Sequence, residues 1–283
     1  MTGRYRGAVS PDAAITRRTP IKAFTAGAAV GGIGGLVGLG GAEFRLPLLI
    51  AVFGFAALTA VIVNKAMSLV VVIAAIPARL FAVPLADVAG EWAVVVNLLI
   101  GSLAGAWVGA AWAARMRTVN LYRVLAVLLV AIAAVFAASH WGVLPSLTLD
   151  GVSLFVVGVI AGFGIGVVAA VMGVAGGELL IPTITVLFGI DVKLAGSLAL
   201  LVSLPTMLVA FLRYSRTQAF SILGEVPGFV IAMAAGSIVG TVAGGLLAGA
   251  VSGAVIGPLV VLLLLTSAWK VWQHASAEGL DNT

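Results

Sequence analysis

The stretch Gly38-Leu39-Gly40-Gly41-Ala42-Glu43-Phe44-Arg45-Leu46-Pro47 decides how this chain folds, and it occurs twice. The second copy, 135 residues later, reads Gly173-Val174-Ala175-Gly176-Gly177-Glu178-Leu179-Leu180-Ile181-Pro182. Each copy places glycines, a carboxylate and a proline inside a long apolar run. Glycine and proline both weaken a helix interior, and lipid tolerates interrupted backbone only where protein or water covers it. A charged side chain at such a break predicts a functional site.

The composition indicates a membrane protein. The 283 residues are 62% hydrophobic and only 9% charged, which is too little charge to cover the surface of a soluble domain. A bilayer is crossed by about 20 helical residues. Apolar runs of suitable length lie at 46–63, 93–114, 121–138, 152–172, 226–250 and 254–269. The alternating pattern of a β-barrel is absent, so we expect an all-α polytopic membrane protein.

Several kinds of site are disfavoured by the residues present. The chain has no cysteine, which excludes disulfides, thiolate metal sites and a cysteine nucleophile. Its two histidines, His140 and His274, lie far apart in the sequence, which argues against a histidine metal cluster. The net charge of +5 reflects basic residues ahead of the first apolar run, which hold that end in the cytoplasm. We therefore expect no metal, no cofactor and no nucleic-acid partner.

The internal repeat extends beyond the two Gly-rich copies. At the same offset Ser68 matches Ser203, and Gly101-Ser102-x-x-Gly105-x-x-x-Gly109 matches Gly236-Ser237-x-x-Gly240-x-x-x-Gly244. Small residues four apart let two helices approach closely, so this second pattern predicts a tight helix contact. The predicted parts are a basic cytoplasmic tail (1–21), a first membrane repeat (22–138), an external connector (139–150), a second membrane repeat (151–273) and a C-terminal tail (274–283).

Each repeat is predicted to contain one interrupted apolar run followed by three membrane-spanning helices. In the first repeat the interrupted run has pieces at about 22–38 and 46–54, and the helices follow at about 57–78, 92–114 and 120–138. The first of these helices is expected to end near Pro77 and Arg79, and 79–91 is expected to be a loop.

Loop charges predict the orientation, because cytoplasmic loops are rich in Lys and Arg. The basic tail, the loop with Arg115, Arg117 and Arg123, and the loop with Arg213 and Arg216 are then inside. The loop 79–91 and the connector 139–150 are then outside. Each interrupted run becomes a hairpin that enters and leaves on one side, and the two halves become inverted copies. Lys193 would lie outside, so parallel halves with one long broken helix each remain the alternative.

The hairpin tips are the predicted substrate site, because interrupted helices present backbone N–H groups and helix N-termini that bind anions. A lysine within a membrane helix, such as Lys65, attracts an anion or pairs with a carboxylate. The predicted substrate-binding residues are Gly38, Gly40, Gly41, Glu43, Arg45, Pro47, Lys65 and Ser68 in the first half and Gly173, Gly176, Gly177, Glu178, Pro182 and Ser203 in the second.

Glu43 and Glu178 are also candidates for proton coupling. Burial favours the neutral form of a carboxyl group, so a buried glutamate can carry a proton. The alternative is that each glutamate is ionised, either paired with Arg45 or Lys65 or capping backbone N–H groups. Arg45 occurs only in the first copy, so the predicted site is not symmetric.

Two halves that each open with a Gly-rich hairpin ending in proline resemble the TauE/SafE family of membrane permeases, over about residues 24–272. The family pattern, close to G-x-G-G-G-x-x-x-x-P, is matched at Gly38, Gly40, Gly41 and Pro47 and at Gly173, Gly176, Gly177 and Pro182. The chain departs from it at Ala42 and Ala175 and adds the two glutamates. The resemblance implies export or import of sulfite, sulfoacetate or a related small anion across the cytoplasmic (inner) membrane.

We therefore expect a secondary transporter of a small anion, with proton coupling through the paired glutamates and no enzyme activity. Neither Gly-rich break contains the G-x-x-x-x-G-K-[ST] pattern of an ATP-binding loop. A passive anion channel is one alternative, and an intramembrane enzyme using the glutamates as acid and base is another. The expected partners are the anion, the lipid bilayer and, if the transporter is a homo-oligomer, a second copy of the chain.

Overall fold

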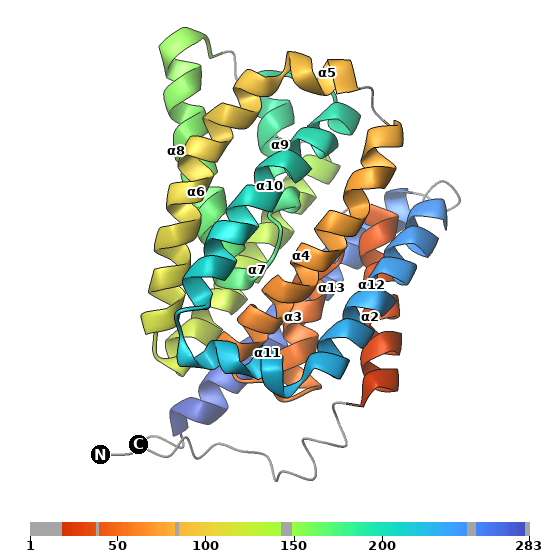
Figure 1. The fold of residues 1–283 in the computed structure, drawn as a ribbon, viewed down its shortest axis with the longest axis vertical. Coiled ribbons are helices and arrows are strands. Elements are labelled where there is room, and N and C mark those ends of the chain that lie inside the picture. The colour runs from red at the N-terminus through yellow and green to blue at the C-terminus, as the bar shows by residue number, and fades with distance from the viewer. Residues whose placement is uncertain (1–18, 38–39, 83–84, 143–148, 248–252, 281–283) are drawn as a thin grey trace.

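The chain folds into a bundle of helices (Figure 1). The computed structural model describes residues 19–37, 40–82, 85–142, 149–247 and 253–280, and within these ranges there are twelve α-helices, one 3-10 turn and no strand. The elements of the first half are α2 (Pro20–Val37), α3 (Ala42–Ala51), α4 (Ala57–Ala82), α5 (Leu85–Gly90), α6 (Trp92–Arg115) and α7 (Thr118–His140). Those of the second half are α8 (Gly151–Met172), α9 (Gly177–Phe188), α10 (Val192–Tyr214), η1 (Gln218–Ser221), α11 (Ile222–Glu225), α12 (Pro227–Leu247) and α13 (Gly253–Leu280).

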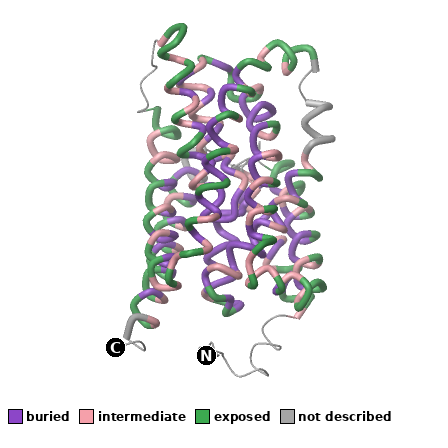
Figure 2. Tube along the Cα trace, turned by 60° about the vertical axis from the view of Figure 1, so that its left-hand side comes forward, coloured by how far each residue is buried: buried purple, intermediate pink, exposed green. Residues whose placement is uncertain are grey.

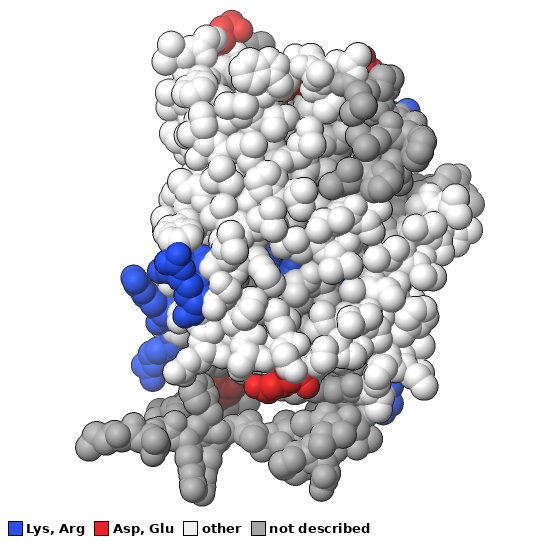
Figure 3. All heavy atoms as spheres, viewed as in Figure 1, with Lys and Arg blue, Asp and Glu red and all other residues white. Residues whose placement is uncertain are grey.

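Six of these helices, namely α4, α6, α7, α8, α10 and α12, are long and apolar enough to cross a membrane. Their surfaces agree with that role, since large apolar side chains such as Trp92, Leu212 and Ile231 are exposed around the bundle. Buried residues follow its interior (Figure 2). On the face in Figure 3 charged side chains gather towards the ends and on one flank, beside a broad uncharged region. The prediction of a polytopic helical membrane protein is confirmed.

Three of the predicted element boundaries are wrong. The second arm of the first hairpin begins at Ala42, not at 46, and contains Pro47 in its second turn. Helix α4 continues past Pro77 to Ala82, and α5 forms within the predicted loop 79–91. The errors at α4 and α5 came from reading proline as a helix end, whereas a packed membrane helix tolerates proline because its neighbours satisfy the backbone groups that it leaves unpaired.

Each interrupted run folds back as a hairpin, as predicted. In the first, the Gly40 N–H donates to the carbonyl of Gly34 at 3.3 Å, and the end of α3 lies beside the start of α2. In the second, a Cβ at Gly176 would lie 3.2 Å from that of Ala169, and the Phe188 ring that ends α9 packs against Gly158 near the start of α8. The reversals rest on glycines with left-handed backbone, with φ of 76° and 75° at Gly40 and Gly41 and 72° and 84° at Gly173 and Gly176.

The two halves interlock through their glycine-rich helices. Helix α2 packs closely along α12 and helix α8 along α6, so the first arm of each hairpin lies against a helix of the other half. Glycines leave room for this contact. Those of α6, Gly101, Gly105 and Gly109, face the backbone of Val159, Phe163 and Val167, and those of α12, Gly236, Gly240 and Gly244, face Phe24, Ala28 and Gly32. The predicted tight helix contact is confirmed, and its partner is the hairpin of the opposite half.

Equivalent parts of the two halves lie at different ends of the bundle. Helix α5, between α4 and α6, is at the top of Figure 1, whereas η1 and α11, at the matching position between α10 and α12, are at the bottom. The start of α2 lies at the same end as α11.

Candidate functional site

The two hairpin tips meet on α4. The Asn64 side chain donates to the carbonyl of Ala42, at the start of α3, at 3.1 Å, and to that of Met172, at the end of α8, at 3.3 Å. Asn64 is fully buried. One amide group of the first half therefore contacts the tips of both hairpins.

Arg45 lies beside this junction with its guanidinium completely buried. Its Nε donates to Oδ1 of Asn64 at 2.8 Å, its Nη2 to the Ser68 hydroxyl at 2.7 Å, and its Nη1 to the Ser237 hydroxyl at 3.0 Å. The first two partners are on α4 and the third is on α12. All three partners are neutral, so the positive charge is held in place without a carboxylate on any of these hydrogen bonds.

The tip of the second hairpin is held by side chains that donate to its backbone carbonyls. The Lys65 ammonium donates to the carbonyls of Ala169 and Val174, each at 2.7 Å, and Ser68 donates to that of Gly173 at 3.3 Å. The Tyr214 hydroxyl donates to the carbonyl of Ala170 at 2.9 Å. The last carbonyls of a helix have no intrahelical donor and form the negative end of its dipole. A lysine there supplies both hydrogen-bond donors and a positive charge.

Glu43 and Glu178 occupy equivalent places in the first turns of α3 and α9. They are 1% and 3% exposed, and none of their four carboxylate oxygens has a hydrogen-bond partner among the described residues. Proline also removes the N–H that would bond to each glutamate's own carbonyl, because Pro47 and Pro182 follow them by four residues. Each hairpin thus carries unsatisfied acceptors at its tip, and each is available for a proton or a ligand.

The structure places the other residues of the predicted site as follows. Gly40, Gly41, Gly173 and Gly176 form the two breaks, Gly177 begins α9, and Pro47 and Pro182 lie within the returning arms. Ser203 on α10 is 1% exposed and its hydroxyl has no partner among the described residues. Gly38 lies outside the described residues. Binding roles for all of these residues stay predictions.

Asn64, Ser237 and Tyr214 were not among the predicted site residues. Asn64 is polar and lies next to Lys65 in a membrane helix, and on that ground it could have been predicted as a site residue. Ser237 belongs to the repeated small-residue pattern, which we interpreted only as a helix contact. Nothing in the sequence indicates that Tyr214, near the end of α10, reaches the carbonyl of Ala170.

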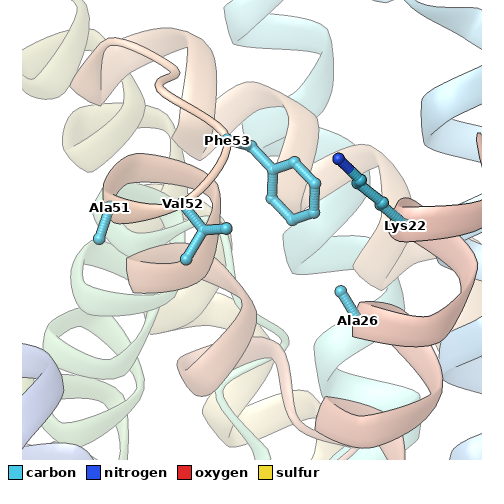
Figure 4. Close-up of a pocket in the computed structure, with 5 residues that line it drawn as sticks. All are labelled: Lys22, Ala26, Ala51, Val52 and Phe53. Carbon is cyan, nitrogen blue, oxygen red and sulfur yellow. The ribbon is translucent and has the colours of Figure 1, made fainter. Parts of the chain in front are cut away.

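A hollow lies at the opposite end of the first hairpin from its tip (Figure 4). It is lined by Lys22 and Ala26 of α2 and by Ala51, Val52 and Phe53 at the end of α3. In Figure 4 the Lys22 side chain and the Phe53 ring extend into the same space. The hollow separates the two open ends of the hairpin and contains none of the predicted binding residues.

One comparison with known proteins identifies a family. The family described as "Sulfite exporter TauE/SafE" matches residues 23–271, which is nearly the whole chain. Neither a curated protein nor a solved structure gives a match.

Proposed function

The chain belongs to the sulfite exporter TauE/SafE family of membrane transporters, and from that premise we propose that it moves a small oxyanion, such as sulfite or a sulfonate, across the cytoplasmic membrane. The observation that carries the proposal is the buried Arg45 guanidinium, whose hydrogen-bond partners are all neutral. Guanidinium has five N–H donors, of which three are used here. The remaining donors suit an oxyanion, which would also supply the missing negative charge.

Lys65 and Arg45 have different tasks in this proposal. Lys65 uses two of its three N–H donors on the carbonyls of Ala169, in the last turn of α8, and Val174, just after that helix, so it holds the second hairpin in position. Arg45 contacts the anion together with N–H groups at the start of α3, which have no intrahelical acceptor. The Ser68 hydroxyl contributes to both tasks: it accepts a hydrogen bond from Arg45 at the anion site and donates one to the Gly173 carbonyl of the second hairpin.

We further propose that Glu43 and Glu178 couple anion movement to protons. Two carboxylates beside an anion site repel the anion, and protonation removes that repulsion. Their burial and lack of partners support this role, since a carboxylate kept only for structure would be expected to have hydrogen bonds. Protons and the anion would then bind together and cross together.

The two halves would act as inverted copies, as the loop charges predict. The arrangement of α5 at one end and α11 at the other supports inversion. Four basic residues lie where α6 and α10 end at the α11 end of the bundle: Arg115 and Arg213 in the last turns, and Arg117 and Arg216 just after them. We assign that end to the cytoplasm.

Uptake of labelled sulfite, sulfonates and carboxylates into proteoliposomes tests the proposal. Each anion is measured with and without a pH gradient, for the unchanged chain and for Glu43→Gln and Glu178→Gln. Glu225→Gln, the same change on an exposed glutamate, is the matched control. We expect gradient-driven uptake that the two buried changes abolish and the control preserves. Gradient-independent flux that survives both changes would indicate a passive channel, and absence of flux for every anion would reject the proposal.

A further inference from the structure

Helices α6, α9 and α10 contain buried polar oxygens that take no part in the hydrogen bonds of Arg45 and Lys65. They belong to Asn97 on α6, to Thr185 on α9, and to Ser197 and Ser203 on α10, and none has a hydrogen-bond partner among the described residues. An unpartnered polar atom inside a membrane helix bundle is destabilising, so several on adjoining helices require an explanation.

These oxygens lie at two depths below the α5 end of the bundle, and the Asn97 amide also donates to the carbonyl of Phe155 on α8 at 3.1 Å. Asn97 and Ser197 each follow the start of their helix by five residues, and Thr185 precedes the end of α9 by three. At about 1.5 Å per residue they are roughly 5–8 Å inside the end of the bundle that carries α5. Ser203 and Glu178 are eleven and ten residues from the same helix ends, about 15–17 Å deep. The helices pack together, since Leu98, Ile184 and Leu198, each next to one of the outer polar residues, share one apolar cluster.

The positions equivalent in the repeat lack this series of polar residues. At the offset of 135, Asn97 corresponds to Ala232, Thr185 to Ile50 and Ser197 to Ile62. Ser203 corresponds to Ser68, which is hydrogen-bonded to Arg45 and to the Gly173 carbonyl. The repeat therefore keeps both glutamates, whereas Asn97, Thr185 and Ser197 have only apolar counterparts.

The charges at the outer end of this series favour a cation. Glu91 precedes α6, Asp150 precedes α8, Asp191 precedes α10 and Asp87 lies on α5, and Figure 3 shows acidic side chains at that end. The basic side chains described there are Lys193 and His140. Carboxylates around an entrance concentrate cations and repel anions.

We propose that Asn97, Thr185, Ser197 and Ser203 line a hydrated path along which protons reach Glu178 from the α5 end. Water along the path satisfies the four oxygens and carries the proton to a carboxylate oxygen of Glu178, whereas the counterparts of Asn97, Thr185 and Ser197 in the repeat are apolar. The assignment of protons rests on the proposed function, but the existence of a hydrated path does not.

Cysteine labelling tests the path, because the chain contains no cysteine of its own. The variants are Ser197→Cys and Thr185→Cys, and the matched controls are their counterparts in the repeat, Ile62→Cys and Ile50→Cys. Each is treated in proteoliposomes with a membrane-impermeant methanethiosulfonate, which reacts only with a thiolate and therefore needs water at the thiol. Size-exclusion chromatography shows that each variant is folded before labelling.

We expect both path positions to react at least about tenfold faster than both controls, and only with reagent on the α5 side. The exposed position Ala86→Cys on α5 identifies that side. Equal rates at path and control positions, or no reaction at Ser197→Cys and Thr185→Cys, would overturn the proposal whether or not the protein transports anions.

A flux measurement tests whether the path carries protons. Ser197→Ile installs the side chain found at the equivalent position of the first half. We expect it to slow uptake driven by a pH gradient several-fold while leaving exchange of labelled for unlabelled anion at equal pH unchanged. Unimpaired gradient-driven uptake would reject the proton assignment, and impaired exchange would show that Ser197 belongs to the anion site instead.

Discussion

At the scale of single residues, Arg45 joins α3 to two other helices. It reaches Asn64 and Ser68 on α4 and Ser237 on α12, which is 192 residues away in the sequence. A buried charge is tolerated only where its donors are satisfied, and three neutral oxygens in different directions suit the planar fork of guanidinium.

Arg45→Lys should therefore impair the anion site although it keeps the charge. Lysine cannot reach all three oxygens from one position, and hydrogen bonds to a charged group contribute about 1.5–3 kcal/mol each. We expect the KM for anion uptake to rise at least about tenfold. Uptake kinetics in proteoliposomes measure this, and an unchanged KM would contradict the assignment of Arg45 to the substrate.

Lys65→Met should lower stability rather than specificity. The change removes the Lys65 donor from the carbonyl of Val174, at about 1–3 kcal/mol for a buried acceptor, and one of two donors from that of Ala169, which also accepts from the Val174 N–H. The thermal unfolding midpoint in detergent should fall by several degrees, whereas Leu200→Met, at the equivalent position of the second half, should leave it nearly unchanged. If Lys65→Met abolished anion binding in a protein of normal stability, the ammonium would be a substrate contact.

The charged residues of the site could be predicted because a charge in an apolar run is conspicuous. Glu43, Arg45, Lys65 and Glu178 are all buried, as expected for intramembrane groups at a break. Their partners could not be predicted. Arg45 binds a serine on α12 and Lys65 binds backbone carbonyls of α8, and these contacts depend on how distant helices pack.

At the scale of helices, close packing depends on single glycines. The repeated small residues predicted a tight contact, and periodic apolar runs predicted α6 and α7 to within two residues. The identity of the partner helix depends on the tertiary arrangement and is not encoded in the local pattern. The extra turn of α4 and the presence of α5 also depend on packing, because the local sequence around a proline is compatible with either a helix or a loop.

Gly105→Ala should separate α6 from α8. A Cβ at Gly105 would collide with the backbone carbonyl of Phe163, which a helix cannot move without shifting as a whole. We expect a loss of about 1–3 kcal/mol in stability, seen as a lower thermal midpoint. Gly164→Ala is the control, since it lies on α8 with no atom within 4 Å of the added Cβ and should be neutral or slightly stabilising. Equal effects of the two changes would contradict the packing described.

At the scale of the whole molecule, the offset of 135 relates elements at opposite ends of the bundle. Ala86 on α5 and Ser221 at the end of η1 are equivalent in the repeat, and both are exposed. Loop charges alone left inverted and parallel halves as alternatives, because Lys193 disagrees with the inverted arrangement.

Inversion predicts that Ala86→Cys and Ser221→Cys react from opposite sides of the membrane. An impermeant thiol reagent should label Ser221→Cys only from the cytoplasmic side and Ala86→Cys only from the other. Right-side-out and inside-out vesicles provide the two sides. Labelling of both positions from one side would establish parallel halves.

The interlocking of α2 with α12 and of α8 with α6 has a consequence for biogenesis. When the ribosome has produced the first half, the glycine-rich side of α2 faces lipid or an insertion chaperone, because its partner is among the last helices to be made. Neither half is then a unit that matures alone. Two separately expressed fragments divided in the connector should be degraded individually and should accumulate only when produced together.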